Sequence, residues 1–371
     1  MYRKTARMFA SLCVSLCLLG AMPVRVAAWS KDGHKIVALI ALWRLEQLKA
    51  KNALRNINDI LNSTPETPMP RKPSELIEAA TWPDDVREED AYKFAANLHF
   101  VSILVDKNVD KDRYNKFKNC KPSTENVPQI PEGVCIIGAL EHYSKVLATS
   151  TSKKERLEAL SFITHFMGDM HQPLHTSEDM SFINHLKPDA KNPKKDRGDR
   201  GGNHRFIFYL DEKPFRDIDP ESCLKKPNAC TEGFKNEDGE DIRSNRKLHA
   251  AWDKYMIVSE MRRKNSERPD FEAYAKFLTA SLPKNPLATD YASMEKGDFV
   301  SWAEATHDLA EKNAYNLAGP VIKISPADGE EYKFYLLDNA YREKNLKIID
   351  RQLILAGIRL AALLRQIYPD A

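Results

Sequence analysis

The sequence predicts an all-α protein, a single large multi-helix domain with a minor β-hairpin. Apolar residues recur at intervals of three and four in the segments near both ends of residues 29–371. Alternating runs typical of strands are scarce, and the clearest, Phe206 to Leu210, is expected to form the small hairpin. No internal repeat or Gly/Ser-rich linker divides the chain, so we expect residues 29–371 to form one domain.

Residues 1–28 have the pattern of a secretory signal peptide. Basic residues come first, an apolar stretch follows from Met8 to about Met22, and small residues precede Trp29. The stretch is too short and wrongly flanked for a transmembrane anchor. We therefore expect a mature protein that begins at Trp29 and is secreted or held in the lumen of the secretory or lysosomal pathway.

Cleavage at this position would also change the charge of the protein. It removes four basic residues and no acid, which takes the formal net charge from +3 to −1. A protein with this charge has no global basic field to bind nucleic acid non-specifically. An anionic substrate would therefore be held by local groups or by metal ions.

The two terminal helices of the mature chain are predicted from apolar stripes at His34 to Leu48 and at Ile349 to Ile367. Both are interpreted as packed core helices. Loops are indicated at Thr64 to Pro73 and at Ser177 to Gly202, where turn-forming and charged residues gather.

A central helix is predicted from Ser152 and Glu155, which have capping-box spacing. It should begin near residue 153 and end at Gln172, since the following proline disfavours helical geometry there. His165 and Asp169 are four residues apart on this helix, on the same face as two phenylalanines. A histidine and a carboxylate therefore project towards the interior.

A buried carboxylate needs a compensating charge, and for one His-x-x-x-Asp pair the histidine itself could supply it. The spacing recurs, however, at His249 and Asp253. Two helices that offer imidazole and carboxylate to one interior are typical of metal sites in helical proteins. Nitrogen and oxygen donors without thiolates favour zinc, with manganese or iron as alternatives.

The mature chain retains four cysteines, Cys120, Cys135, Cys223 and Cys230, which predict two disulfides in an oxidising compartment. Of the three possible connectivities, the nearest-neighbour pairing is favoured because both segments are rich in turn residues. A zinc site is the rival interpretation, although the paired C-x-x-C spacing is lacking. Asn62 begins an N-S-T glycosylation acceptor.

An ordered set of motifs then indicates a family. The set comprises a Trp-Ser-x-x-Gly-His start at residue 29, WPDDVR at 82–87, NLHF at 97–100, HFMGDMHQPLH at 165–175, GGN at 201–203 and LHAAWD at 248–253. Together these resemble the secreted zinc-dependent single-strand-specific nucleases, also called class I nucleases or 3'-nucleotidase/nucleases. The bacterial zinc phospholipases C are similar at a greater distance.

The resemblance implies three Zn²⁺ ions with nine protein ligands. One ion would be held by Asp84, His99, His165 and Asp169; a second by Asp169, His34 and the α-amino and carbonyl groups of Trp29; and the third by His175, His249 and Asp253. It implies hydrolysis of single-stranded DNA and RNA to 5'-phosphate products by metal-activated water, and of 3'-nucleotides to nucleosides. No stable protein partner is implied.

Further roles follow from position relative to these ligands. Asp84 could orient the attacking water, and Arg87 could stabilise the charge that develops on phosphorus or merely pair with Asp84. Phe100 could stack on a base or belong to the core, with Asn203 as a hydrogen-bonding partner of the substrate. His171 is expected to be supporting or structural, because it points away from the ligand face.

Four other histidines lack a partner at ligand spacing and are expected to be solvated or packed: His142, His185, His204 and His307. The chain departs from the family at Ser102, where an aspartate is common, and in the long segment before GGN. The basic residues of that segment, between 187 and 200, predict a solvated loop or a flap near the substrate. The alternatives to a nuclease are a zinc phospholipase C and a secreted structural or zinc-sequestering helical protein, in which the ligands only hold the fold.

Overall fold

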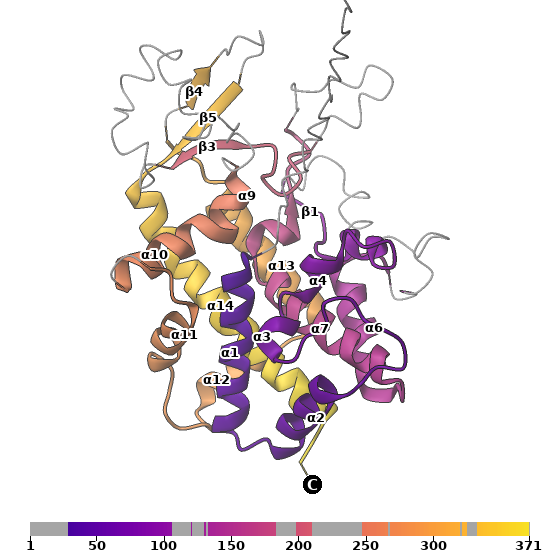
Figure 1. The fold of residues 1–371 in the computed structure, drawn as a ribbon. Helices are drawn as coiled ribbons and strands as arrows, with labels where there is room; N and C mark the ends of the chain where they lie inside the picture. The colour runs from indigo at the N-terminus through magenta and orange to yellow at the C-terminus, as the bar shows by residue number, and fades with distance from the viewer. Residues whose placement is uncertain are drawn as a thin grey trace, which may run out of the picture.

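The computed structural model describes residues 29–105, 120, 130, 133–182, 198–209, 247–265, 268–319, 321–324 and 332–370. Helices dominate this part of the chain, which confirms the all-α prediction (Figure 1). The expected signal peptide, Cys223, Cys230, His185 and residues 187–197 lie outside the described residues. Every described helix is too short or too polar to cross a lipid bilayer.

The helices of the described chain range from three residues in α9 to 29 in α14. In chain order the helices are α1 Lys31–Gln47, α2 Lys51–Asn62, α3 Leu76–Ala79, α4 Trp82–Val86, α6 Ile136–Thr149, α7 Lys153–Met170, α9 Leu248–Ala250, α10 Met256–Lys264, α11 Phe271–Ala280, α12 Thr289–Glu295, α13 Phe299–Leu309 and α14 Asn339–Ile367. Short 3-10 turns are η1 Lys93–Leu98 and η2 Pro173–Thr176, and π-helical turns are η6 Ala251–Tyr255 and η7 Ala310–Ala314. The strands are β1 Ile103–Leu104, β2 Ser177–Glu178, β3 Phe206–Tyr209, β4 Val321–Ile324 and β5 Tyr332–Leu337.

The core forms where α1, α7 and α14 meet, and glycines let these helices approach closely. A Cβ at Gly357 of α14 would lie 2.6 Å from the Ile40 Cβ of α1. A Cβ at Gly168 of α7 would lie 2.8 Å from the Nδ1 of His34. The absence of a side chain at Gly168 therefore allows His34 of α1 to reach the face of α7 that carries His165 and Asp169.

Two small sheets complete the described fold. The strand predicted at Phe206 is present, but β3 pairs in parallel with β5, and the antiparallel partner of β5 is β4. The antiparallel pair β4–β5 supplies the minor hairpin. Its predicted placement at Phe206 to Leu210 is wrong, because β3 instead adds a parallel strand to β5, which is distant in sequence. This sheet lies at the end of the bundle opposite the C-terminus (Figure 1).

The second sheet is the parallel pair β1–β2, with Ile103 opposite Ser177. The Val101 amide donates to the His175 carbonyl at 2.9 Å just before these strands. The pairing thus brings the segments of His99 and His175 side by side. A disulfide joins Cys120 to Cys135, the residue that precedes α6, as the nearest-neighbour pairing predicts.

Helix α7 begins where the capping pattern predicts. The Ser152 hydroxyl accepts a hydrogen bond from the Glu155 amide at 3.3 Å. The other half of the box is replaced, because the Ser152 amide donates to the Ser150 hydroxyl at 3.1 Å. The Glu66 carboxylate in turn accepts from the Lys153 amide at 2.9 Å and from the Lys154 amide at 3.2 Å. A loop before α3 thereby satisfies the amides and dipole at the start of the central helix.

Replacing Glu66 by Gln should lower the melting temperature at pH 7. The hydrogen bond from the Lys153 amide, with others, holds the pKa of Glu66 at about 2, below its ordinary 4.5. Its stabilising effect is therefore complete above pH 4.5 and is lost as the pH falls towards 2. Thermal melts of the wild type and Glu66→Gln between pH 3 and 7 should converge in acid, while the surface control Glu272→Gln should match the wild type throughout. A pH-independent difference would contradict this assignment.

Candidate metal centre

All eight side chains that the resemblance implies as ligands come together in the structure. They form three groups, in each of which the donor atoms lie within 4.8 Å of one another. The groups are His34, His165 and Asp169; Asp84, His99 and His165; and His175, His249 and Asp253. We refer to them as the first, second and third clusters.

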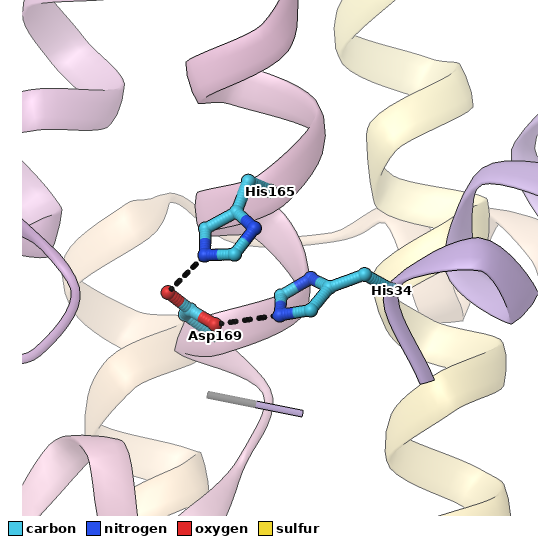
Figure 2. A group of neighbouring side chains, drawn as sticks. All are labelled: His34, His165 and Asp169. Carbon is cyan, nitrogen blue, oxygen red and sulfur yellow. Dashed lines mark ion pairs between the residues drawn. The ribbon is translucent and has the colours of Figure 1, made fainter. Parts of the chain in front are cut away.

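Asp169 lies between His34 and His165 in the first cluster (Figure 2), and it also contacts His99 of the second cluster. Its Oδ1 is 3.2 Å from His34 Nε2, and its Oδ2 is 3.2 Å from His165 Nε2. Oδ2 also lies 3.0 Å from His99 Nδ1. The carboxylate thus offers one oxygen to each side, which is the geometry that a bridging ligand requires.

The second cluster is the part of this pair nearest to solvent. Asp84 Oδ1 lies 4.0 Å from His99 Nδ1 and 4.0 Å from His165 Nε2. Asp84 and His99 are 8% and 5% exposed, whereas His34, His165 and Asp169 are fully buried. A substrate would therefore approach the pair from the side of Asp84 and His99.

The third cluster joins η2 to the helix that contains LHAAWD. His249 Nε2 lies 3.1 Å from His175 Nε2 and 3.2 Å from Asp253 Oδ2. The π-helical turn η6 contains Asp253, and such turns are frequent at functional sites because they re-aim a side chain within a helix.

Backbone carbonyls fix which nitrogen of three imidazoles carries the proton. The Nδ1 atoms lie 2.7 Å from Ala80 O for His165, 2.8 Å from His99 O for His175 and 2.6 Å from Gly201 O for His249. Each Nδ1 must therefore donate its proton to a carbonyl. The Nε2 lone pairs remain directed into the clusters, as metal binding requires.

With these tautomers, the third cluster has the charge and geometry of a cation site. In the third cluster two Nε2 lone pairs face each other at 3.1 Å, a repulsive contact unless a positive charge lies between them. A proton is disfavoured there, since burial lowers the pKa of both imidazoles, that of His249 to about 4. Tetrahedral zinc with bonds of about 2.0–2.1 Å separates its nitrogen ligands by roughly 3.3 Å. The donor set fits such an ion.

Burial also acts on the carboxyl groups, and in the opposite direction. It raises the pKa of Asp169 and of Asp253 well above the ordinary value and that of Asp84 to about 6, where His165 and Arg87 oppose the rise. Burial therefore disfavours the charged form of each of these groups. A divalent ion reverses this for the carboxylates, because it is the largest local charge.

Unpartnered atoms support the same interpretation. Among the described residues, both ring nitrogens of His34, Nε2 of His99 and Oδ1 of Asp169 are buried and make no hydrogen bond. His34 Nε2 and Asp169 Oδ1 are near each other but lack hydrogen-bond geometry. Buried polar atoms of this kind are rare unless an ion or water satisfies them.

The segment at Trp29 is anchored beside the clusters. Trp29 is fully buried, and its indole Nε1 donates to Gly168 O at 2.7 Å. The Ser30 amide donates to Asp253 O at 2.9 Å. Residue 29 is therefore held between the helix that carries Asp169 and the turn that carries Asp253.

The remaining predicted site residues have distinct surroundings. Arg87 Nη1 lies 3.3 Å from Asp84 Oδ1. Phe100 is 41% exposed, so the interpretation as a core residue is wrong. Asn203 donates from Nδ2 to Arg200 O at 2.9 Å, and its Oδ1 is buried.

Three further histidines have structural surroundings. His171 is buried and points away from Asp169, with Nδ1 2.7 Å from Met167 O and Nε2 accepting from Arg359 at 2.8 Å. Burial lowers the pKa of His171 to about 3. His204 is partly buried, with Nδ1 3.1 Å from Gly198 O, and His307 is packed against the Ser177 hydroxyl.

One residue of the site is not among the predicted ones. Gln172 is fully buried between His171 and Pro173, and its Nε2 donates a hydrogen bond to Asp253 Oδ1. Its sequence signal is weak, because glutamine is not a usual metal ligand. Only its place between two ligands of one motif could have indicated it.

An all-α fold with three buried His/Asp clusters that could each hold a metal ion is the arrangement of a metal-binding protein. Residues 29–214 and 237–369 match the model of the S1/P1 nuclease family. The chain therefore belongs to the S1/P1 nuclease family, and its function is that of a metal-dependent nuclease acting on nucleic acid.

The chain is also similar to individual members. It is 25% identical to Endonuclease 2 of Arabidopsis thaliana over 96% of this chain and 95% of that protein. It is 24% identical to Nuclease P1 of Penicillium citrinum over 92% and 98% of the two chains. The similarity to Nuclease S1 of Aspergillus oryzae is higher, 30%, but spans 40% of this chain and 44% of that protein.

Removing metal ions should destabilise the protein. An ion present at a hundred times its dissociation constant stabilises the folded state by about 2.7 kcal/mol. We therefore expect a chelator to lower the melting temperature in calorimetry and stoichiometric zinc to restore it, with metal content measured alongside. Chelator saturated beforehand with zinc is the control. A metal-free protein that melts at the original temperature would contradict a metal centre.

Proposed function

We propose that the protein is a secreted zinc-dependent nuclease that hydrolyses single-stranded DNA and RNA to 5'-phosphate products and 3'-nucleotides to nucleosides. The observation that carries the proposal is the convergence of eight side chains into three clusters, with Asp169 between two of them. Membership of the S1/P1 nuclease family supports the phosphodiester substrate. The names of the relatives, Endonuclease 2 and Nuclease P1, agree with it.

We assign the ions as three Zn²⁺. His34 and Asp169 with the amine and carbonyl of Trp29 would hold one, Asp84, His99, His165 and Asp169 another, and His175, His249 and Asp253 the third. The nitrogen and oxygen donors suit zinc, and the lack of thiolates does not exclude it. When bound, the ions lower the pKa of a water molecule and neutralise charge on the phosphate.

The protein groups at the exposed side of the second cluster would orient the reactants. The Asp84 carboxylate can accept a hydrogen bond from the attacking water and direct its lone pair at phosphorus. The Arg87 guanidinium, 3.3 Å from Asp84, both holds that carboxylate and offers further N–H groups to a phosphate oxygen. In this proposal Arg87 pairs with Asp84 and contacts the phosphate in the same position.

Phe100 would recognise an unpaired base. It directly follows the ligand His99 in sequence and is 41% exposed, so part of its ring is open to solvent. Stacking on an aromatic ring tolerates any base but requires that the base be unpaired. Asn203 would supply a hydrogen bond to the substrate.

The compartment and the maturation of the chain are part of the proposal. The buried position of Trp29 beside Gly168 supports cleavage after residue 28, because a free α-amine is a better ligand than a peptide nitrogen. The Cys120–Cys135 disulfide suits an oxidising compartment. Asn62 is exposed at the end of α2, where a glycan can be attached.

A zinc phospholipase C remains the alternative enzyme and would use a similar set of ligands on a lipid phosphodiester. The family match favours the nuclease. Incubation with denatured DNA and with phosphatidylcholine vesicles distinguishes the two activities. Release of acid-soluble nucleotides alone supports the nuclease, and release of phosphocholine alone supports the phospholipase C.

Asp84→Asn should lower kcat on denatured DNA by roughly 10²–10³-fold, because one charged group at the reacting centre is lost. Asp85→Asn is a matched control, since Asp85 is the next residue of α4 but pairs with Lys31 at 2.7 Å. It should retain both activity and metal content. Equal losses in the two variants would refute the role of Asp84.

Phe100→Ala should raise KM for oligonucleotides by about 5- to 150-fold, which corresponds to the loss of roughly 1–3 kcal/mol of stacking. Phe277→Ala is the control, because Phe277 of α11 is 47% exposed but lies far along the chain and contacts Lys264. Steady-state kinetics on a single-stranded oligonucleotide measure both. An unchanged KM in Phe100→Ala would rule out stacking on this ring.

A further inference from the structure

Gln172 is a buried polar residue in contact with ligands of two clusters. It directly follows His171, the residue that ends α7, and is fully buried. The amide of its backbone donates to Asp169 O at 3.0 Å, and its own carbonyl accepts from the His175 amide at 2.9 Å. The main chain at this residue therefore joins the helix of the first cluster to a ligand of the third.

The side chain makes a second, separate connection. Its Oε1 accepts a hydrogen bond from the Leu174 amide at 2.6 Å. Because this oxygen is engaged, the amide nitrogen must face Asp253, and Nε2 donates to Asp253 Oδ1. The orientation of the side chain is thus fixed at both ends.

This contact decides which oxygen of Asp253 remains for a cation. Oδ1 accepts from Gln172, whereas Oδ2 lies 3.2 Å from His249 Nε2. A hydrogen bond to one carboxylate oxygen limits rotation of the group and favours its charged form. Metal ligands held in this way are typically ten- to a hundred-fold better binders than the same ligands without support.

We propose that Gln172 is a positioning residue of the third cluster, which orients Asp253 to bind a cation and keeps it in register with Asp169. The inference rests on the proposed function, since it assumes that the third cluster binds a metal ion. Glutamine suits the position because it combines a donor for Asp253 with an acceptor for the Leu174 amide. Asparagine, one methylene shorter, cannot span both partners, and glutamate would place two carboxylates together.

The test compares two buried glutamines. Gln172→Met keeps the length of the side chain but removes both hydrogen-bonding groups. Gln352→Met is the matched control, because Gln352 is 3% exposed and donates to His171 O and to Thr306 Oγ1, each at 3.0 Å, away from the clusters. Zinc content is measured by mass spectrometry, and affinity is measured by competition with a chromophoric chelator.

We expect Gln172→Met to bind one of three zinc ions about 10- to 100-fold more weakly and the other two as the wild type does. Gln172→Glu should weaken the same ion at least as much. In the metal-stripped protein Gln172→Met should lower the melting temperature about as much as Gln352→Met does, because each substitution removes two hydrogen bonds of a buried side chain. Gln352→Met should melt lower but bind all three ions normally.

Several outcomes would overturn the proposal. If Gln172→Met binds three ions with wild-type affinity, the positioning role is wrong while the proposed function stands. If Gln172→Met weakens the binding of all three ions equally, Gln172 is only structural. If Gln172→Met does not fold, wild-type zinc affinity in Gln172→Glu has the same meaning. A wild type that binds no zinc contradicts the proposed function itself.

Discussion

The architecture depends on the cost of burying two aspartates among imidazoles. Asp169 and Asp253 are 0% and 3% exposed, and the rings around them direct lone pairs inward. Protein groups alone compensate only part of this arrangement, because the ring nitrogens of His34 make no hydrogen bond within the described residues. The buried donor atoms therefore do not satisfy one another fully, and their arrangement suits divalent cations. The helices pack around these buried groups, and the turns η2 and η6 direct His175 and Asp253 into the third cluster.

Three separate parts of the chain satisfy that requirement together. Helix α7 supplies His165 and Asp169, and the β1–β2 pairing brings the segments of His99 and His175 together. The segment at Trp29 connects α7 to η6. Its indole donates to the carbonyl of Gly168, and the Ser30 amide donates to the carbonyl of Asp253. Carbonyls from three different loops fix the tautomers. The site is thus built by backbone as much as by side chains.

Much of this was predictable from local rules. The start of α7 follows from Ser152, and the shared face of His165 and Asp169 follows from helical periodicity. The repeated spacing at His249 and Asp253 indicated a second ligand pair, and the resemblance supplied the rest of the ligand set. The unpredicted features are long-range. β3 pairs with a strand beyond residue 330, Glu66 caps a helix nearly ninety positions away, and Gln172 reaches Asp253. Local spacing does not predict these contacts, because each joins residues that are brought together only when the whole chain folds.

The close approach at Gly168 has a consequence for engineering. Replacing a glycine within a helix by alanine is a common way to gain roughly 1 kcal/mol of stability, since alanine has the higher helix propensity. In α7 the new methyl group would lie 2.8 Å from the ring of His34, so the helices would have to separate. Helix α7 therefore keeps a residue of low helix propensity at this position, because His34 occupies the space of a side chain. Thermostable variants would have to come from surface positions and loops, leaving this interior glycine untouched.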